Sequence, residues 1–442
     1  MSEEELITSS VKRMVKLGTV VGRVGASMLT EKALSFLRSE NSQKVSKIKN
    51  LTENAQLIFE TLGKLKGAAM KAGQMISLYQ GLLPPEVSEI LGKLQKEAPC
   101  VPFEVMEEEI KTELKENFSL FKYINPKPYA AASIGQVHKG ELHDGRKVAV
   151  KIQYPAMDYI IRSDLKNLKL FLSTLISFFM NINPEPVWEE IQERLLEEID
   201  YRQEAEHLRE MTRLYAGYPE IVIPKIIEEV SASRVMTMEL CEGIPPHEAC
   251  SEKYSSELKS QWGRTLYEYA LRGIWEFQYL HADPNLGNFS FLPDGKVIVY
   301  DFGCVKKIPH YLALGYARLV KAVLEEKQTQ IPEILKEMGI YKADGSLFSQ
   351  KVVDSYFDFF GQIFRKSPPY RFGENEDFYT RLFDLMHSHW QETSDIRFPR
   401  DVVFIDRTMS GHFGNLCKFH AVAPWRDIIG GFAYRCLEMS EK

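Results

Sequence analysis

Residues 281–303 constrain the fold most, because they read as a polar loop that runs into a tight β-hairpin. Two short runs of β-branched and aromatic residues flank an Asp-Gly pair at 294–295, and Asp-Gly is a strong hairpin signal. If this pair forms a two-residue turn, Asn288 lies opposite Asp301. Cross-strand neighbours have Cβ atoms about 4.5–5.5 Å apart, so the spacing predicts that an amide oxygen and a carboxylate meet.

Amide and carboxylate oxygens suit Mg²⁺, which usually takes one or two carboxylates together with substrate phosphates. Asp283 precedes Asn288 by five residues, where a base or a nucleophile-orienting carboxylate could stand. A lone Asp-Phe-Gly would more simply mark a solvated surface hairpin. The complete set of Asp283, Asn288 and Asp301 favours a phosphoryl-transfer site instead.

A second hairpin is predicted between residues 129 and 153, with its turn at 143–146. A two-residue turn there places His138 opposite Lys151, which could reach nucleotide phosphates, although a lysine on a strand is often only an edge residue. Small residues precede this hairpin in a predicted alanine-rich loop, which should be stiffer than a glycine-rich loop. The predicted nucleotide-binding residues here are Ala130, Ala131, Ala132, Ser133, Ile134, Gly135 and Ala149.

Helices are predicted at about 158–180 and 185–214. Glu204, in the second helix, is the natural partner of Lys151 in a kinase small lobe. Glu198 and Asp200 would point to different sides of a continuous helix, so a shared role requires an irregular helix. A solvated acidic face is the simpler alternative. The strand at 234–241 has the shape of an interlobe hinge, with candidate nucleotide contacts at Met238, Glu239 and Cys241.

The first 80 residues are predicted to be largely helical. A basic amphipathic helix at 11–37, with Val15 and Leu29 near its apolar face, suits an anionic membrane surface or an ordinary docking site. A polar stretch at 40–50 is predicted to be a linker. In the next helix, Lys71 and Gln74 are three residues apart and share a face.

Composition narrows the classes of function. The net charge of −6 argues against a nucleic-acid partner, and six scattered cysteines indicate neither a zinc site nor a disulfide framework. The N-terminus is too acidic for a signal or transit peptide. The longest apolar run, 170–180, is shorter than the ~20 residues of a membrane span. We therefore expect a cytoplasmic protein with at most peripheral membrane contact.

After Asp-Phe-Gly the pattern predicts an all-helical region. It shows no metal-type cluster of histidine or cysteine. The expected helices cover about 308–326, 329–338, 347–365, 376–391 and 400–419.

Taken together, the motifs resemble the UbiB (aarF-domain) family of atypical kinases, in its coenzyme Q-associated subgroup. The resemblance runs from about residue 57 to the C-terminus and rests on five motifs in order. They are Lys71-Ala-Gly-Gln74, the alanine-rich loop up to His138, Lys151, Glu198-Ile-Asp200 with Glu204, and the catalytic loop with Asp301-Phe-Gly303.

This resemblance implies an α+β, bilobal, kinase-like fold with a helical extension folded across the cleft. The implied divisions are 1–50 (helix and linker), 51–120 (extension), 121–243 (N-lobe) and 244–442 (C-lobe). Lys71 and Gln74 would reach the site in a regulatory role, with Lys71 meeting Glu198 and Asp200. The C-terminal transmembrane pair of bacterial members and the transit segment of mitochondrial members are not expected here.

The family further implies ATP or ADP and Mg²⁺ as cofactors. Its expected partners are a quinone-precursor lipid or anionic membrane and prenylquinone biosynthetic enzymes. Two functions remain open: an ATPase or small-molecule or lipid kinase that supports ubiquinone metabolism, and a nucleotide-switched scaffold without useful phosphoryl transfer. An ordinary protein kinase fits less well, because a helical extension of about 120 residues would occupy the peptide groove.

Overall fold

The structure is a computed structural model of the 442-residue chain. It describes residues 15–65 except 28 and 32–39, residue 90, residues 101–179 except 133, residues 184–364, and residues 369–440 except 374–380, 383, 386–387 and 390–395. The chain forms two compact units. Unit 1 comprises Met1–Gln203 and Ile226–Leu240, and unit 2 comprises Glu204–Lys225 and Cys241–Lys442.

In the described part of unit 1, five strands form an antiparallel sheet in the order β1-β3-β4-β6, with β2 paired to β3. Its strands are β1 (Phe121–Ile124), β2 (Ala130–Ala132), β3 (Gly135–Leu142), β4 (Lys147–Gln153) and β6 (Val235–Glu239). The predicted strands are therefore present. The alanine-rich stretch, however, is a short strand rather than an open loop.

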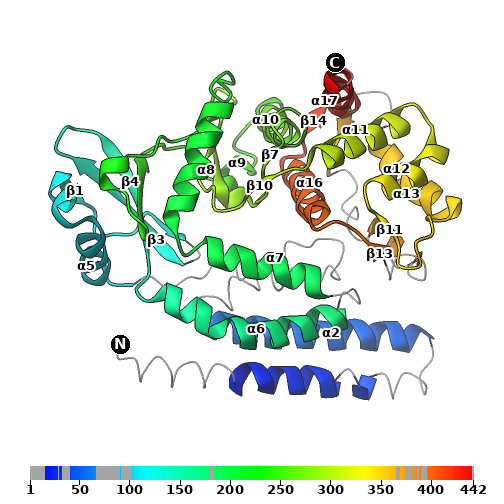
Figure 1. Cartoon of the computed structure of the whole chain (residues 1–442), viewed down its shortest axis with the longest axis horizontal. Coiled ribbons are helices and arrows are strands. Elements are labelled where there is room, and N and C mark those ends of the chain that lie inside the picture. The colour runs from blue at the N-terminus through cyan, green and yellow to red at the C-terminus, as the bar shows by residue number, and fades with distance from the viewer. Residues whose placement is uncertain are drawn as a thin grey trace. The chain divides into compact units, whose positions relative to one another are not determined.

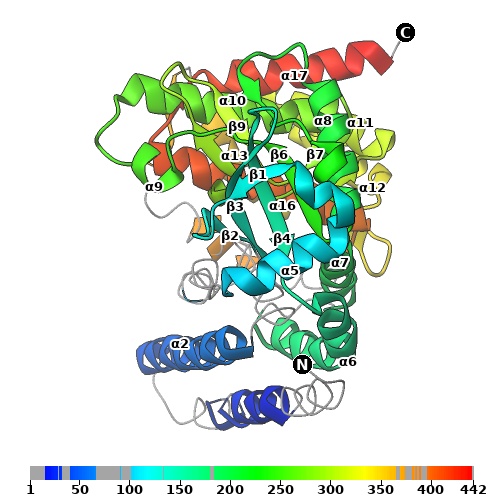
Figure 2. The same ribbon diagram turned by 90° about the vertical axis from the view of Figure 1, so that its left-hand side faces the viewer.

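Alternate residues of β4 face the core of unit 1, as predicted. Val148, Val150 and Ile152 are buried, and each such side chain contributes about 1.5–3 kcal/mol. They share a core with the apolar side of α5 (Phe103–Leu114), formed by Met106, Ile110 and Leu114. Figure 2 shows α5 lying against this sheet. Two short 3₁₀ helices, η2 (Lys115–Leu120) and η3 (Glu228–Val230), complete the region.

The predicted register of the β3–β4 hairpin is wrong by one residue. Lys151 lies opposite Val137, and His138 lies opposite Val150. The cause is a three-residue connection at 143–145, closed by the backbone hydrogen bond from Leu142 to Arg146. Gly145 adopts φ +89°, the left-handed residue that three-residue hairpin loops commonly need.

The N-terminal segment also departs from prediction. Residues 15–27 are helical, but the linker expected at 40–50 is the start of α2 (Glu40–Leu65). The Nδ2 atom of Asn50 donates to Ser27 Oγ at 2.7 Å, so polar residues here join two helices. The predicted apolar face is wrong too: Val15 and Leu29 are exposed, and the buried residues are Leu17, Val20 and Val24.

Three helices follow the sheet's first four strands. They are α6 (Met157–Phe179), α7 (Pro184–Glu197) and α8 (Tyr201–Leu214). The single helix predicted at 185–214 is therefore wrong, because the chain turns at 198–200. Asp200 Oδ1 accepts the backbone N–H of Arg202 at 3.0 Å, as a capping residue does at a helix N-terminus. The helix is therefore interrupted at 198–200, as a joint role of Glu198 and Asp200 requires.

Unit 2 is mainly helical (Figure 1). Its helices are α9 (Pro246–Ala249), α10 (Ser256–Trp275), α11 (His310–Leu324), α12 (Ile331–Glu337), α13 (Gln350–Phe364), α16 (Arg400–Phe419) and α17 (Trp425–Ser440), with η4 (Leu286–Asn288) and η5 (Gln328–Gln330). Helix α17, which lies beside α11, was not predicted. The helix predicted at 376–391 lies largely outside the described residues.

Short strands position the loops of unit 2. They are β5 (Ile221–Val222), β7 (Tyr279–His281), β8 (Phe289–Phe291), β9 (Val297–Val299), β10 (Val305–Lys307), β11 (Tyr341–Lys342), β12 (Tyr370–Arg371), β13 (Ile396–Arg397) and β14 (Val422–Ala423). Strand β9 pairs with β8 and, in parallel, with β5. The pairing of β7 with β10 was not predicted, since residues up to 279 read as helix.

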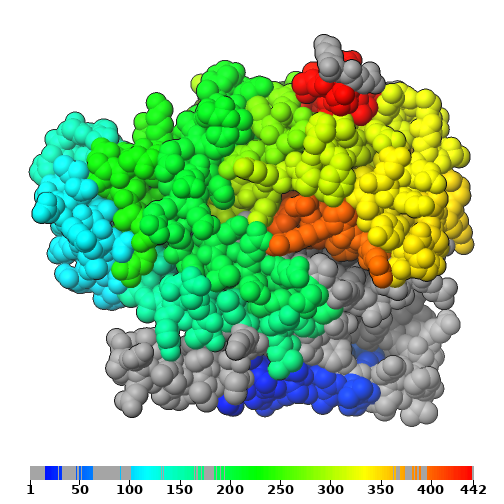
Figure 3. All heavy atoms as spheres, in the orientation of Figure 1, coloured from blue at the N-terminus to red at the C-terminus, as the bar shows by residue number. Residues whose placement is uncertain are grey.

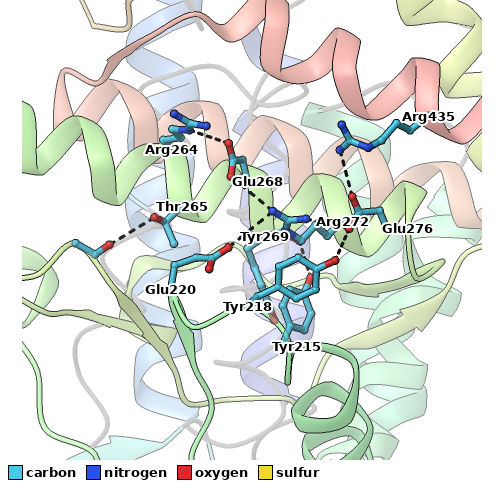
Figure 4. Close-up of polar contacts among 11 residues, drawn as sticks. Tyr215, Tyr218, Glu220, Arg264, Thr265, Glu268, Tyr269, Arg272, Glu276 and Arg435 are labelled. Carbon is cyan, nitrogen blue, oxygen red and sulfur yellow. Dashed lines mark hydrogen bonds and ion pairs between the residues drawn. The ribbon is translucent and has the colours of Figure 1, made fainter.

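A polar network fixes the segment before β5 to α10 (Figure 4). The Arg272 guanidinium pairs with Glu276 at 3.0 Å and lies 3.8 Å from Glu220. It also lies 4.0 Å from the ring centroid of Tyr218. The side chains of Arg272 and Glu276 are only 15% and 18% exposed, so removing either one would leave the other without this ion pair in a site largely removed from water.

Candidate active site

The hairpin that carries the predicted metal ligands forms, but its register differs from the prediction. The Tyr300 N–H donates to the Asn288 carbonyl at 3.0 Å, so Asn288 pairs with Tyr300 rather than with Asp301. As in the first hairpin, the connection has three residues, and Gly295 takes φ +87°. Asp301 therefore lies one residue beyond the position opposite Asn288.

Other contacts bring Asp301 to the loop that carries Asp283 and Asn288 despite that shift. Strand β7 leads into the loop and pairs with β10, which follows Asp-Phe-Gly. The buried His281 donates from Nε2 to the Asp301 carbonyl at 2.7 Å, and the N–H of Ala282 donates to Cys304 O at 2.7 Å. Burial lowers the pKa of His281, which keeps the ring neutral in this role. The loop and the Asp301 segment are thus held together at two points.

The loop itself is shaped by its own side chains. Asp283 Oδ1 accepts the N–H of Asn285 at 3.1 Å, and Asn285 Oδ1 accepts the N–H of Gly287 at 3.1 Å, which starts η4. Asn288 Nδ2 points to the Asp283 carbonyl at 3.4 Å. With its nitrogen turned to this carbonyl, Asn288 can offer Oδ1 to a cation. Such oxygen donors fit Mg²⁺.

Helix α8 contributes two further side chains to this part of unit 2. His207 Nδ1 donates to the Phe302 carbonyl at 3.1 Å. The buried Glu204 is close by: a methyl group built on Gly303 would lie 3.2 Å from Asp301 Oδ1 and 3.9 Å from Glu204 Oε2. The carboxylates of Asp301 and Glu204 are therefore both close to Gly303. His207 follows Glu204 by three residues, a spacing that could have signalled its role.

The hinge region contacts the β8–β9 hairpin and the residue that follows it. The Tyr300 hydroxyl donates to the Cys241 carbonyl at 3.0 Å, and Ile244 forms a bridge with Phe291. A side chain on Gly243 would meet Ser290 Cβ at 2.9 Å, so the backbone approaches the hairpin closely. The Cys241 carbonyl, a predicted nucleotide contact, already serves Tyr300. Sequence reasoning did not single out Tyr300.

In unit 1, the predicted hinge residues Met238 and Glu239 end β6. Met238 is buried opposite Ala149, and Glu239 is exposed opposite Val148. Ala149 therefore lies between the lysine-bearing end of β4 and the hinge, which is compatible with contact to a nucleotide base.

The predicted phosphate-binding stretch of unit 1 is tightly packed. Ala130, Ala131 and Ala132 pair with β3, and the Ile134 carbonyl accepts the N–H of Tyr154 at 2.8 Å. A methyl group on Gly135 would lie 2.1 Å from Ile152 O, so only glycine fits there. Ser133 lies outside the described residues.

Lys151 and the acidic motif of unit 1 are near each other. Lys151 is a buried residue and its Nζ lies 5.0 Å from the Tyr201 ring centroid, while the Gln153 amide donates to Glu198 O at 3.2 Å. Burial would raise the pKa of Asp200, but hydrogen bonds from Arg202 are the larger influence and lower it.

Three predicted interactions of this region stay predictions. One of them is the contact of Lys71 with Glu198 and Asp200, because Lys71 and Gln74, which are both expected to reach the site, lie outside the described residues. The others are the pairing of Lys151 with Glu204, whose residues belong to separate units, and the nucleotide contacts of the hinge.

A lysine-bearing strand in an antiparallel sheet, a hinge, a loop with Asp283 and Asn288, and a hairpin ending in Asp-Phe-Gly define a kinase-like fold. The comparison with known families narrows this class. The ABC1 atypical kinase-like domain matches residues 93–335, more than half of the chain. The chain belongs to this family of atypical kinases, which confirms the resemblance found in the sequence.

Relatives match most of the chain at moderate identity. It is 29% identical over 436 residues to "Atypical kinase COQ8B, mitochondrial" of Rattus norvegicus, covering 96% of this chain and 81% of the relative. The protein of the same name from Danio rerio is 31% identical over 329 residues, covering 72% of this chain and 52% of the relative. This chain thus spans most of the rat relative but about half of the zebrafish one.

A solved structure also resembles the chain. It is described as the complex of Rv3197 with erythromycin, from Mycobacterium tuberculosis, and it is 27% identical with a TM-score of 0.62. The match covers 89% of this chain and 100% of that one. Among the helices that the structure describes here, none is long and apolar enough to cross a membrane.

Proposed function

We propose that this protein binds Mg-ATP and acts as an atypical kinase or ATPase that supports prenylquinone metabolism. The observation that carries the proposal is the β7–β10 pairing with its hydrogen bond from His281 to the Asp301 carbonyl. It joins the loop of Asp283 and Asn288 to the Asp-Phe-Gly segment. Phosphoryl transfer depends mainly on such positioning and on electrostatic stabilisation.

Each residue has a role suited to its chemistry. Asp283 would orient the nucleophile or accept its proton, and the oxygens of Asn288 and Asp301 would hold Mg²⁺. Bound Mg²⁺ would neutralise charge on the β- and γ-phosphates. Lys151 would contact the α- and β-phosphates, with Glu204 fixing its position. The stretch 130–135 and the hinge residues 238–241 would hold the nucleotide.

The test of this chemistry is Asp301→Asn, which keeps the size of the side chain and removes its charge. We expect the rate of ATP hydrolysis, measured with lipid present, to fall by about 100-fold or more, because a metal ion stabilises charge by several kcal/mol. Asp294→Asn is the matched control. It makes the same change in the exposed turn of the hairpin and should keep wild-type turnover.

Two results would contradict the proposal. One is a wild-type protein that neither binds nor hydrolyses Mg-ATP in the presence of lipid, and the other is full turnover in Asp301→Asn. Nucleotide binding without hydrolysis, combined with altered partner binding in Asp301→Asn, would favour the alternative of a nucleotide-switched scaffold.

The quinone part of the proposal rests on membership of the family and on relatives that carry COQ8 names. Quinone profiling of cells whose only copy is Asp301→Asn tests it. We expect depleted prenylquinone and accumulated precursors. A cytoplasmic location with peripheral contact to lipid is part of the same proposal, and fractionation of those cells with the wild-type copy tests it.

A further inference from the structure

Helix α16 lies far beyond Asp-Phe-Gly in the sequence, yet it contains several buried polar residues. Arg407 is 5% exposed, Asn415 is 3% exposed and His412 is 1% exposed. Other parts of α16 reach the surface of unit 2, where they appear orange in Figure 3. Arg407 and Asn415 make hydrogen bonds to residues outside α16, whereas the ring nitrogens of His412 have no hydrogen-bond partner among the described residues. Burial of a polar group is unfavourable unless it is hydrogen-bonded, so the two bonded residues are the informative ones.

Two of these residues bind the backbone on either side of Asp283. Arg407 Nη2 donates to the Ala282 carbonyl, and Asn415 Nδ2 donates to the Pro284 carbonyl at 2.8 Å. Arg407 Nη2 also lies 3.1 Å from Cys304 Sγ, directly after Asp-Phe-Gly. A single arginine therefore contacts both the catalytic loop and the Asp301 segment, at the point where Ala282 and Cys304 already share a backbone hydrogen bond.

A third contact is steric. The Pro284 ring packs directly on the backbone of α16 at Gly411, where a methyl group would lie 2.2 Å from Pro284 Cγ. Ordinary contact begins at 3.4 Å, so a side chain at 411 would have to move the ring by about 1.2 Å (3.4 − 2.2). His412 fills the space beside Gly411, with its ring centroid 6.2 Å from that of Phe289.

We infer that α16 is a positioning element for Asp283: Arg407 and Asn415 hold the carbonyls that flank it, and Gly411 sets the distance between Pro284 and the helix. This inference rests on the proposed function, since it assigns the element that fixes the loop of the same site. The three are positioning residues and act through the backbone. They explain how a loop with little regular structure can hold a carboxylate in place.

The sharpest test is Gly411→Ala in the full-length protein. Alanine favours a helix more than glycine does, so the substitution should leave α16 folded while it displaces Pro284. We expect turnover of Mg-ATP to fall by about 10- to 100-fold, because a shift of about 1 Å at a reacting group can have that effect. Nucleotide affinity should stay within about threefold of wild type, since the atoms that a methyl group at residue 411 would meet belong to Pro284, which is not a predicted nucleotide-binding residue.

The matched control is Gly431→Ala in α17, where the added methyl group would meet only the flexible end of Arg435 at 3.4 Å. It should retain both turnover and affinity. Wild-type turnover in Gly411→Ala, or a parallel loss of turnover and affinity, would overturn the inference.

A second pair keeps the test decisive if Gly411→Ala does not fold. Asn415→Leu removes the bond to Pro284, whereas Thr408→Val removes an equally buried hydroxyl that bonds only to Phe404 O within α16. Turnover should fall in the first variant and not in the second. Equal losses in both would show a purely structural role.

Failure of the proposed function would be distinguishable from failure of this inference. If the wild type does not hydrolyse ATP, hydrogen exchange of the amides at 282–288 replaces turnover as the readout. The inference then predicts faster exchange in Gly411→Ala than in wild type or Gly431→Ala. Equal protection in all three proteins would reject it.

Discussion

Gln136 and His138 belong to a chain of hydrogen bonds in unit 1 that runs from Asn125 to Val101. His138 Nδ1 lies 2.8 Å from the Asn125 carbonyl, which can only accept, so this nitrogen carries the proton. Its Nε2 therefore accepts from the Gln136 amide at 3.2 Å. The same Gln136 bonds both the N–H and the carbonyl of Val101, which ties the incoming chain to β3. Protonation of His138 would place two donors face to face.

This arrangement predicts a dependence of stability on pH. Burial lowers the pKa of His138, and the bond to Asn125 only partly opposes that effect. The unfolded chain takes up a proton near pH ~6.5, whereas the folded chain does so at lower pH, so acid favours unfolding within that window. In His138→Leu, the fall in unfolding free energy of unit 1 should be less steep by up to ~1.4 kcal/mol per pH unit.

Native-state hydrogen exchange of the β3 amides, measured from about pH 7.5 to about pH 5, reports this slope. His138→Leu should also lower stability by about 1–3 kcal/mol near pH ~7.5, where His138 is neutral, because the Gln136 amide loses its acceptor. The offset and the slope are separate quantities. Identical slopes in the two proteins would refute the assignment of His138.

The sequence predicts the roles of some site residues better than those of others. Lys151, Asp283 and Asp301 could be predicted as site residues because each lies in a recognisable sequence motif. Arg407 and Asn415 sit in an ordinary helical pattern more than 100 residues after the loop that they hold, as their separations of 125 and 131 residues show. Only the three-dimensional fold brings them to Asp283, so no local pattern could have indicated their role.

At the scale of elements, the two hairpins share one lesson. Strands β3, β4, β8 and β9 were predicted, yet both registers were wrong by one residue. In each case Asp-Gly was read as a two-residue turn, whereas the structure uses three residues with a left-handed glycine at the third. The sequence signal for the two kinds of loop is nearly the same, but a shift of one residue exchanges every facing pair.

The glycines of these loops provide a paired prediction. Gly145→Ala should destabilise its hairpin by about 1–2 kcal/mol, because an L-residue is strained at positive φ and nothing else lies within 4 Å. Gly295→Ala should destabilise its hairpin by about 1 kcal/mol more, since the methyl group also displaces Gln261, which bonds to Asp294 O. Hydrogen exchange in each hairpin measures both changes. A larger effect at position 145 would contradict this account.

Helix α17 shows why an element can be missed altogether. Its sequence contains Gly430 and Gly431, and glycine is a poor helix former. Tertiary packing reverses this disadvantage, because a methyl group on Gly430 would lie 2.9 Å from the side chain of Leu324 on α11. The glycine permits a close approach of the two helices, and Trp425 is buried at the start of α17.

At the scale of the whole molecule, neither unit is a continuous stretch of sequence. The chain passes between them after Gln203, after Lys225 and after Leu240. The expected lobe boundary at 243 stays a prediction, and the assignment of Glu204–Lys225 to unit 2 was not expected. That segment supplies β5 to β9 and the Tyr215 hydroxyl to the Tyr269 carbonyl at 2.7 Å.

This connectivity predicts how fragments behave. The fragment 204–442 contains every residue of unit 2 and should unfold cooperatively on heating. The fragment 241–442 lacks β5 and Tyr215 and leaves Tyr269 without its buried partner ring at 4.8 Å, so it should lack a sharp transition. Circular dichroism during heating distinguishes the two. A sharp transition in the shorter fragment would show that Glu204–Lys225 is dispensable.

The packing of the Pro284 ring on the backbone of Gly411 offers a practical tool. If the inference holds, Gly411→Ala would slow turnover without altering any charge, any proposed magnesium ligand or any exposed side chain. Cells that carry Gly411→Ala would therefore separate the effects of the proposed nucleotide turnover from the effects of the protein's presence alone.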